Sequence, residues 1–301
     1  MTLALLFPGQ GSQFVGMGKA LAAESAAARA VFEEADGVLG FALSRLCFEG
    51  PEEELRLTAN TQPAVLTHAV AALADLRARA PERLVGAAYA AGHSLGEYAA
   101  AVATGAVAFR DAVALVRARG AFMQEAVPAG VGAMAAIVGL DASAVEAACA
   151  EAADGEIVSP ANYNSPEQTV IAGHAGAVRR ASERCLARGA KRAIPLPVSA
   201  PFHCALMAPA REKMRPLLER TAFSEAAIPV VTNADAAPES AGPRLRDALV
   251  RQIDSPVRWV ESVRRLAAAG VDRAIEIGPG NVLAGLVRRI DRTIRMESHA
   301  G

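Results

Sequence analysis

Residues 84–96 read LVGAAYAAGHSLG, and this stretch decides how the chain folds. A short apolar run ends in the pattern Gly-x-Ser-x-Gly at Gly92, Ser94 and Gly96, and the helix-prone residues 97–102 follow. A strand, a sharp turn and a helix in this order form the elbow that exposes a nucleophilic serine at the end of a sheet. Glycine is needed where the turn leaves no room for a Cβ atom. The stretch therefore predicts that Ser94 is a nucleophile, although a plain turn between a strand and a helix would have the same sequence.

The composition is that of a globular protein and excludes several classes of function. The chain has 301 residues, of which 52% are hydrophobic and 21% charged, and its formal net charge is −1. Binding to nucleic acid would require a basic field that this balance does not supply. The five histidines show no metal-ligand spacing, and no run of about 20 strongly apolar residues is long enough to span a membrane. We expect no nucleic acid, membrane or metal among its partners.

Cysteine usage and the first residues indicate a cytoplasmic protein. No CxxC pair occurs, and four cysteines are too few for a disulfide scaffold in a chain of this length. We expect all four to be reduced thiols: Cys47, Cys149, Cys185 and Cys204. The apolar run at residues 3–7 lacks a positively charged start and is broken by Pro8, so it does not resemble a signal peptide.

Strands and helices alternate over most of the chain. The predicted strands are 3–7, 84–90, 228–232 and 274–277. The predicted helices are 17–35, 64–79, 95–103, 110–126, 208–220, 244–252, 257–268 and 282–289. This alternation predicts an α/β fold with a hydrolase-like, mostly parallel sheet that is covered on both faces. Residues 296–301 are predicted to be a frayed tail.

The stretch 131–197 has a different rhythm. Its predicted elements are a strand at 133–138, a helix at 141–153, strands at 157–163 and 168–172, a helix at 176–188 and a strand at 190–196. Asp141 is placed to cap the first of these helices. This β-α-β-β-α-β order is typical of a ferredoxin-like domain. We expect an inserted ferredoxin-like α+β subdomain at 131–197 and a larger α/β core made of residues 1–130 and 198–301.

A serine hydroxyl is a weak nucleophile and needs a base, for which His203 is the best candidate. It lies in the proline-stiffened stretch PLPVSAPFHC at 195–204, although a packing or surface histidine would also fit there. The other histidines are expected in less suitable places: His68 in the core, His93 pointing away from its neighbour at the elbow, His174 in a turn and His299 in the tail.

No single motif identifies the group that orients His203 or the donors that stabilise an oxyanion. Asp141 and Asp154 lie between the serine and the histidine in sequence, but capping and solvation explain them better, so a backbone carbonyl or a side-chain amide is an alternative to an acid. One oxyanion donor is expected at the N–H of Leu95. A second is expected from the loop 9–11, which would otherwise be a plain turn or a phosphate nest.

Two arginines lie close together on the helix that follows the elbow. Arg117 and Arg119 stand in the largely apolar stretch LVRARGAFMQ at 115–124. An arginine in such a place either extends its charged end to solvent or pairs with a buried anion. The sequence does not separate the two residues.

Taken together, these motifs identify a resemblance to the bacterial malonyl-CoA:acyl-carrier-protein transacylases of type II fatty-acid synthesis. The resemblance extends over nearly the whole chain and is carried by the stretches FPGQGSQ at 7–13, QPA at 62–64, GHSLGEY at 92–98, RGAFMQ at 119–124, GAMAA at 132–136, NYNSP at 162–166, PLPVS at 195–199, HCALM at 203–207 and GPGNVL at 278–283.

The resemblance implies a ping-pong transfer through a malonyl-serine ester. Ser94 would attack the malonyl thioester with His203 as the general base. The backbone amides of Gln10 and Leu95 would form the oxyanion hole. The backbone carbonyl of Gln252 would orient the histidine, which explains why no triad acid is found.

The resemblance also implies how the substrate is selected. Arg119 would pair with the malonyl carboxylate, and an acetyl group would leave it unpaired at a cost of about 2–5 kcal/mol. Phe202 precedes the histidine, a position where related polyketide acyltransferases have Phe with malonyl and Ser with methylmalonyl specificity, so we expect malonyl to be preferred over methylmalonyl. Asn162 and Met123 are expected to be further substrate contacts.

The expected partners are malonyl-CoA and an acidic acyl carrier protein, with no cofactor, and the chain is expected to be a monomer. Docking of an acidic carrier needs a local basic face. One candidate set is Arg179, Arg180, Arg184, Arg188, Lys191 and Arg192. Arg288 and Arg289 form another, and each set would equally suit a solvated helix face. If the first set is the docking face, charge reversal at Arg184 and Arg188 would raise KM for the carrier.

Three other functions fit parts of the sequence. A serine hydrolase would release free malonate without a carrier. A non-catalytic carrier-binding module would not need Ser94, His203 and Arg119 together. An acyltransferase of polyketide synthesis or of a malonate decarboxylase would share the motifs and differ in the carrier that it serves.

Overall fold

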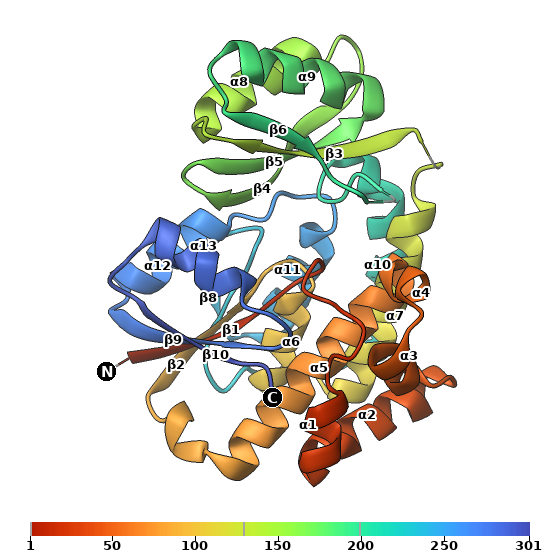
Figure 1. Cartoon of the computed structure of the whole chain (residues 1–301), viewed down its shortest axis with the longest axis vertical. Helices are drawn as coiled ribbons and strands as arrows, with labels where there is room; N and C mark the ends of the chain where they lie inside the picture. Colours follow the sequence, from red (N-terminus) through yellow and green to blue (C-terminus); the bar gives the residue numbers. More distant parts are fainter. Residues whose placement is uncertain (1, 129, 199) are drawn as a thin grey trace.

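Two separate β-sheets organise the chain in the computed structural model, which describes residues 2–128, 130–198 and 200–301 (Figure 1). The larger sheet has the strand order β10-β9-β1-β2-β7-β8. Its strands are Thr2–Phe7 (β1), Ala87–Gly92 (β2), Val230–Val231 (β7), Pro238–Glu239 (β8), Val271–Ile277 (β9) and Arg295–His299 (β10). All neighbouring strands in it run parallel except β7 and β8. The predicted α/β class with a mostly parallel sheet is confirmed.

Both faces of the larger sheet are covered at its centre, which explains why the central strands β1 and β2 are almost continuously apolar. Side chains alternate along β1, so that Leu3, Leu5 and Phe7 face one side and Ala4 and Leu6 the other. The first side packs against the helices Thr58–Arg79 (α5), Gly96–Ala103 (α6) and Phe109–Glu125 (α7). The second packs against Trp259–Ala268 (α12) and Val282–Ile290 (α13).

The remaining helices outside the smaller sheet lie around the layer formed by α5, α6 and α7. They are Lys19–Glu24 (α1), Ala26–Leu39 (α2), Leu43–Glu49 (α3), Glu52–Arg56 (α4), Ala208–Arg220 (α10) and Gly242–Gln252 (α11), with short 3₁₀ turns at Pro81–Leu84 and Ala205–Met207. Among the described residues, none of the helices has both the length and the apolar character that crossing a bilayer requires.

The smaller sheet is antiparallel throughout and has the order β4-β5-β3-β6. Its elements are Gly132–Val138 (β3), Ala142–Ala152 (α8), Val158–Ser165 (β4), Gln168–His174 (β5), Ala175–Ala187 (α9) and Arg192–Pro195 (β6). Both helices cover the face turned away from the larger sheet (Figure 1), and the predicted β-α-β-β-α-β order is present. Asp141 caps α8, as predicted, by accepting a hydrogen bond from the N–H of Ala144 at 3.0 Å.

The smaller sheet is fastened to the rest of the molecule through its edge strand β4. The N–H of Tyr163 donates to the carbonyl of Val257 at 2.9 Å, and the N–H of Val257 donates to the carbonyl of Ala161 at 2.8 Å. The inner face of the sheet contributes Met134 and Val170 to the main hydrophobic core. The assignment of 131–197 as a separate domain stays a prediction, because these contacts join the two sheets closely.

The C-terminal tail was predicted wrongly. Residues 295–299 form β10, which pairs in parallel with β9 at the edge of the larger sheet. Met296 packs against the core, and the imidazole Nε2 of His299 lies 3.3 Å from the carboxylate of Asp75, so this histidine is not in a tail either. The segment is short and polar, and only pairing with a distant strand makes it a strand.

Other differences concern the limits of elements. The helix expected over 17–35 is two helices, because Ser25 ends α1 and its side chain caps α2. The short helices α3 and α4 were not predicted. Strand β2 begins at Ala87 rather than at residue 84, since Pro81 starts a 3₁₀ turn that ends at Leu84.

Candidate active site

The predicted elbow is present between β2 and α6, and close backbone packing enforces it. Ser94 has a positive φ of 51°, which only a tightly constrained non-glycine residue adopts. A Cβ atom on Gly92 would lie 1.9 Å from the backbone carbon of Gly96, and one on Gly96 would lie 2.1 Å from the carbonyl oxygen of Phe7. Both glycines are therefore required by the approach of backbone to backbone, and Ser94 is left at the apex of the turn.

Ser94 and His203 meet as a hydrogen-bonded pair. The Oγ of Ser94 lies 2.7 Å from Nε2 of His203, and Nδ1 of His203 lies 2.9 Å from the carbonyl oxygen of Gln252. A carbonyl can only accept, so Nδ1 carries the proton of the neutral imidazole and Nε2 is the acceptor that faces the serine. Burial lowers the pKa of His203 to about 3, and the charge of Arg119 lowers it further in the same direction. The imidazole is therefore neutral and oriented as a base.

The two aspartates considered as triad acids lie elsewhere. Asp141 is exposed and caps α8, and Asp154 is exposed in the turn after α8. The orienting group is the backbone carbonyl at the end of α11, one of the alternatives that the sequence left open.

The structure separates the two arginines of α7. Arg119 is 1% exposed, and both terminal nitrogens of its guanidinium donate to groups of the site. Its Nη1 donates to Oε1 of Gln62 at 2.8 Å, and its Nη2 donates to Oε1 of Gln252 at 2.8 Å and to Oγ of Ser94 at 3.1 Å. Burial lowers the pKa of Arg119, whereas Tyr98 and Glu97 raise it, and a guanidinium remains charged in proteins. A buried cation thus lies directly beside the serine hydroxyl.

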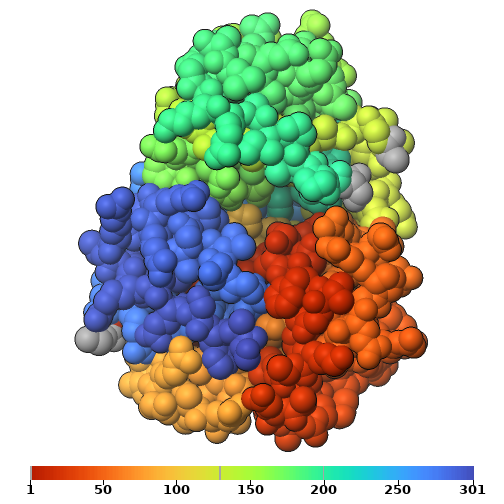
Figure 2. Space-filling view, in the orientation of Figure 1, coloured from red at the N-terminus to blue at the C-terminus, as the bar shows by residue number. Residues whose placement is uncertain are grey.

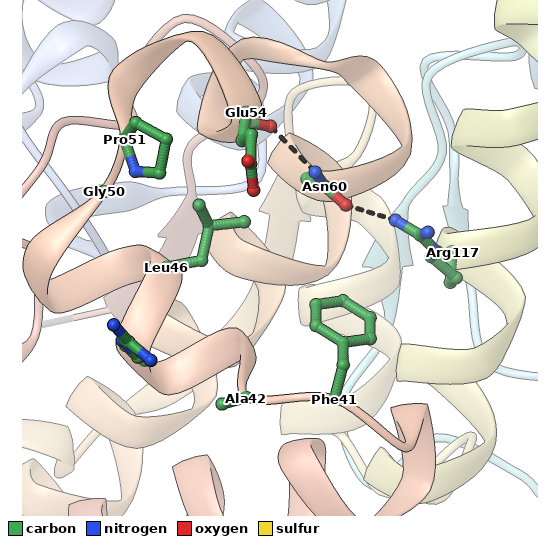
Figure 3. A pocket seen from close by; sticks show the side chains of 9 residues that line it. Phe41, Ala42, Leu46, Gly50, Pro51, Glu54, Asn60 and Arg117 are labelled. Carbon is green, nitrogen blue, oxygen red and sulfur yellow. Dashed lines mark hydrogen bonds between the residues drawn. The ribbon is translucent and has the colours of Figure 1, made fainter.

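Arg117 instead lines a different cavity of about 470 Å³, between α3, α4 and the start of α5 (Figure 3). Its Nη1 donates to the carbonyl of Ala59 at 2.8 Å and to the side chain of Asn60, and its guanidinium lies over the ring of Phe41. These contacts hold Arg117 away from Ser94, so Arg119 alone of the pair reaches the serine.

The loop after β1 lies against the elbow. A Cβ atom on Gly9 would lie 2.4 Å from the carbonyl oxygen of His93. The side chain of Gln10 donates to Oγ1 of Thr58 at 3.4 Å. Within the described residues, the backbone N–H groups of Gln10 and Leu95 donate to no other protein group. Two free donors therefore come from the two loops that flank Ser94.

A cavity of about 480 Å³ joins these groups. It opens where the smaller sheet, the loop after β1 and the residues 196–198 and 202–203 meet, and Figure 2 shows a hollow in this region. Its lining includes every predicted site residue except Leu95 and Gln252, namely Gln10, Ser94, Arg119, Met123, Asn162, Phe202 and His203. Ser199, the last residue of the stretch at 195–199, lies outside the described residues.

The three residues expected to contact substrate lie on different sides of this cavity. Met123 is buried on α7, and its sulfur lies 3.9 Å from Nε2 of Gln62. Asn162 comes from β4, and Phe202 stands directly before His203; each is 8% exposed. The cavity thus combines an aromatic ring and a thioether with polar groups near the serine.

Sequence reasoning missed Asn233, the role of Glu97 and the contacts of the Gln252 side chain behind the elbow. The N–H of Ser94 donates to Oδ1 of Asn233 at 2.6 Å, and Nδ2 of Asn233 donates to the carbonyl of Gly92 at 2.7 Å. Nε2 of Gln252 donates to the carbonyl of Ser94 at 2.9 Å and to Oε2 of Glu97 at 2.8 Å. Glu97 belongs to the stretch GHSLGEY at 92–98, which carries the family resemblance, but no pattern in the sequence assigned it a role.

His93 also lines the cavity, and its imidazole contacts the smaller sheet. Its Nε2 lies 2.8 Å from Oδ1 of Asn164 on β4, and burial lowers its pKa. This contact joins the elbow to the smaller sheet. Among the described residues, no group of three or more His, Cys, Asp and Glu side chains is placed to hold a metal ion.

The four cysteines are free and buried. Burial raises the pKa of Cys47 and of Cys149 to about 12 and that of Cys204 to about 11, and it also raises the pKa of Cys185. Cys204 follows His203 directly, and its thiol donates to the carbonyl of Pro201 at 3.1 Å.

Comparison with known proteins decides the family. The family model described as "Acyl transferase domain" matches residues 4–299. The chain belongs to this acyl transferase family. It is 52% identical over 294 residues to the malonyl CoA-acyl carrier protein transacylase of Escherichia coli (strain K12), covering 97% of this chain and 93% of that protein. It is 49% identical over 294 residues to the protein of the same name from Bacillus subtilis, covering 97% and 92%. The resemblance inferred from the sequence is confirmed.

Solved structures of the acyl transferase family match over nearly the whole chain. An acyl carrier protein S-malonyltransferase from Vibrio cholerae superimposes with a TM-score of 0.95 at 49% identity, covering 99% of this chain and 96% of that chain. A malonyl-transacylase solved in complex with a type II polyketide synthase acyl-carrier protein gives a TM-score of 0.96 at 48% identity, with coverage of 99% and 96%. The shared fold therefore includes the smaller sheet as well as the larger one.

Proposed function

We propose that the chain transfers the malonyl group of malonyl-CoA to the phosphopantetheine thiol of an acyl carrier protein, as an S-malonyltransferase that supplies fatty-acid elongation. The observation that carries the proposal is a serine-histidine pair at 2.7 Å with a buried guanidinium 3.1 Å from the serine oxygen. The pair supplies a nucleophile, and the guanidinium supplies a partner for a carboxylate. The names of the relatives agree with this function.

In the first half-reaction, Ser94 Oγ attacks the thioester carbonyl carbon while His203 Nε2 takes the hydroxyl proton. The negative charge that develops on the carbonyl oxygen is received by the free N–H groups of Gln10 and Leu95. The carbon–sulfur bond then breaks, and His203 returns the proton to the departing sulfur of CoA. The product is a malonyl ester of Ser94.

In the second half-reaction, the pantetheine thiol of the carrier gives its proton to His203 and attacks the ester carbonyl. The bond to Ser94 Oγ breaks, and the proton passes back from His203 to the serine oxygen. His203 thus alternates as base and acid without a net change. No metal or resident cofactor takes part in this scheme.

Selectivity for malonyl follows from Arg119. A carboxylate that enters a closed cavity must be paired, and the guanidinium is placed to pair with it. Phe202 narrows the cavity next to the histidine, so an α-methyl group on the acyl chain would crowd it. Met123 and Asn162 complete the acyl pocket in this proposal.

Docking of an acidic carrier is assigned here to α13 rather than to α9. Arg184 on α9 and Arg188 directly after it both pair with Glu151, at 3.2 Å and 2.6 Å, so a shared acidic residue partly neutralises them. Arg288 and Arg289 are exposed at the end of α13 and have no ion-pair partner among the described residues. Unpaired cations are the better recognition surface for an acidic protein.

We also propose that the enzyme is a monomer of the cytoplasm. It would have two domains, an acyltransferase core of 1–130 and 198–301 and an inserted subdomain of 131–197. The antiparallel sheet with its own helices and core supports this division. Size-exclusion chromatography with light scattering would test the oligomeric state.

Mass spectrometry of the intact protein after mixing with malonyl-CoA tests the function directly. We expect one malonyl adduct that is absent in Ser94→Ala and that is transferred when a phosphopantetheinylated carrier protein is added. Continuous release of malonate without an adduct would instead establish a hydrolase. The absence of both adduct and malonate would reject malonyl chemistry altogether.

A further inference from the structure

Glu97 is a buried carboxylate that the mechanism above does not use. It lies in the first turn of α6, one turn beyond Ser94, and is 1% exposed. Its Oε2 accepts from the N–H of Asn233 at 2.9 Å and from Nε2 of Gln252 at 2.8 Å, and its Oε1 has no partner among the described residues. A carboxylate is costly to bury, so its place behind the nucleophile calls for a function.

Glu97 reaches the active site through the side chain of Gln252. The amide nitrogen of Gln252 faces Glu97, so its oxygen faces the opposite way and accepts from Nη2 of Arg119 at 2.8 Å. A carboxylate only accepts and a guanidinium only donates. The reversed amide would set oxygen against oxygen at Glu97 and nitrogen against nitrogen at Arg119. Nε2 of Gln252 also donates to the carbonyl of Ser94 at 2.9 Å, so Glu97 and this carbonyl together fix which end of the Gln252 amide faces Arg119.

We propose that Glu97 is a positioning residue for carboxylated acyl groups: by fixing the side-chain amide of Gln252, it holds the guanidinium of Arg119 at the cavity. This inference rests on the proposed function, because it assigns Arg119 to the malonyl carboxylate. It adds a buried residue, without contact to substrate, to the determinants of selectivity.

A second branch from the same carboxylate provides an internal comparison. Asn233 is held by Glu97 and accepts from the N–H of Ser94, but no hydrogen bond joins it to Arg119 in the described residues. Loss of the Asn233 branch should disturb the nucleophile for every acyl group. Gln252 also donates to the carbonyl of Ser94, so loss of the Gln252 branch should slow the attack on every acyl group and, in addition, disturb the pairing of a carboxylate with Arg119.

The experiment measures acylation of Ser94 in the full chain with malonyl-CoA and with acetyl-CoA, each over a range of concentrations, by quench and intact mass spectrometry. For Glu97→Ala we expect KM for malonyl-CoA to rise on the order of tenfold to a hundredfold. Glu97→Ala also removes the acceptor that holds Asn233, so acylation by acetyl-CoA and labelling of Ser94 by a fluorophosphonate should fall as well, but by no more than in Asn233→Ala and by less than acylation by malonyl-CoA. Glu97→Gln should recover most of the lost malonyl selectivity, because its amide oxygen still accepts from Gln252.

Further variants keep the test decisive. Glu97→Met fills the same space without an acceptor and replaces Glu97→Ala if that variant does not fold. Gln252→Leu keeps the backbone carbonyl that His203 needs and should lose malonyl selectivity. The double variant Glu97→Met, Gln252→Leu should lose little more malonyl selectivity than either single variant, since both substitutions act through the contact between Gln252 and Arg119. Asn233→Ala should slow both acyl donors alike.

Equal losses with malonyl-CoA, acetyl-CoA and the fluorophosphonate in the Glu97 variants would overturn the proposal and make Glu97 a general support of the elbow. Unchanged malonyl kinetics in Glu97→Met would overturn it as well. Failure of the proposed function is distinguishable from both results, because the unmodified chain itself would then form no malonyl adduct.

Discussion

Ser94 and His203 both hold left-handed backbone conformations, with φ of 51° and 60°. Each such non-glycine residue costs about 1–3 kcal/mol and persists only where its surroundings hold it. At Ser94 the surroundings are specific, since Asn233 accepts its N–H and Gln252 donates to its carbonyl. The strain is thus balanced by side chains from the far end of the sequence, and the reacting atoms are placed before substrate arrives.

Replacing Arg119 should remove selectivity for the carboxylate. We expect Arg119→Ala to lower kcat/KM for malonyl-CoA roughly 30-fold to 4,000-fold, as loss of about 2–5 kcal/mol implies. The ratio of kcat/KM for acetyl-CoA to kcat/KM for malonyl-CoA should therefore rise. Acylation rates measured by mass spectrometry for both esters would show the change. Arg117→Ala is the matched control on the same helix and should leave the ratio of the two esters unaltered; a similar shift in both variants would contradict the assignment.

The pH dependence of acylation should reflect the buried imidazole. His203 acts as a base only when neutral, and its pKa is lowered from 6.5 to about 3, so the neutral form persists as the pH falls through 6.5. We expect kcat/KM for acylation by malonyl-CoA to show no loss from this group between pH 7 and pH 5. Rapid-quench measurements over pH 4–8 would test this. Burial also raises the pKa of Glu97 to about 7, so only a fall centred near pH 6.5 that persists in Glu97→Gln would mean that His203 titrates like an exposed histidine.

Residues of the site could be predicted where a local motif contains them. The Gly-x-Ser-x-Gly pattern marks Ser94, and the resemblance to the family places His203, Arg119 and the carbonyl of Gln252. Asn233 could not be found in this way, because it is 139 residues from the serine whose N–H it accepts and follows a strand of only two residues. Long-range polar contacts of this kind leave no periodic signal in the sequence.

At the level of the elements, the elbow depends on glycines that backbone atoms surround. We expect Gly96→Ala to destabilise the fold by about 1–3 kcal/mol, because the Cβ atom would lie 2.1 Å from the carbonyl oxygen of Phe7 and backbone cannot move aside. Gly285→Ala is the control: a Cβ there meets nothing within 4 Å, and alanine favours the helix α13 by about 0.5–1 kcal/mol. Denaturant unfolding of both variants would test this, and equal stabilities would refute the steric argument.

Elements with their own hydrophobic period were predicted and those that depend on partners were not. The strands β1 and β3 and the helices α6, α7 and α10 lie within about two residues of their expected limits. The strand β10 is polar and becomes a strand only through its pairing with β9. The short helices α3 and α4 are likewise too brief for a helical period to appear in the sequence.

At the scale of the whole molecule, the surface charges predict where a carrier docks. Reversal of Arg288 and Arg289 to Glu should raise KM for the carrier protein several-fold. This increase in KM should be larger at lower salt concentration, because fewer ions then screen the charges. The rate of acylation by malonyl-CoA should stay the same. Steady-state transfer assays with varied carrier would measure this. The comparison variant reverses Arg184 and Arg188, which Glu151 already engages. A larger effect in that variant would move the docking face to α9.

The buried cysteines have a consequence for a protein that handles thiol substrates throughout its cycle. A thiolate near the serine could attack the thioester of malonyl-CoA or the malonyl-serine ester and take the acyl group in place of the carrier thiol. Cys204 is the nearest in sequence to the base, yet burial raises its pKa to about 11, so it stays protonated and unreactive. The other three cysteines are likewise buried with raised pKa values, so the chain offers the acyl group no competing thiolate.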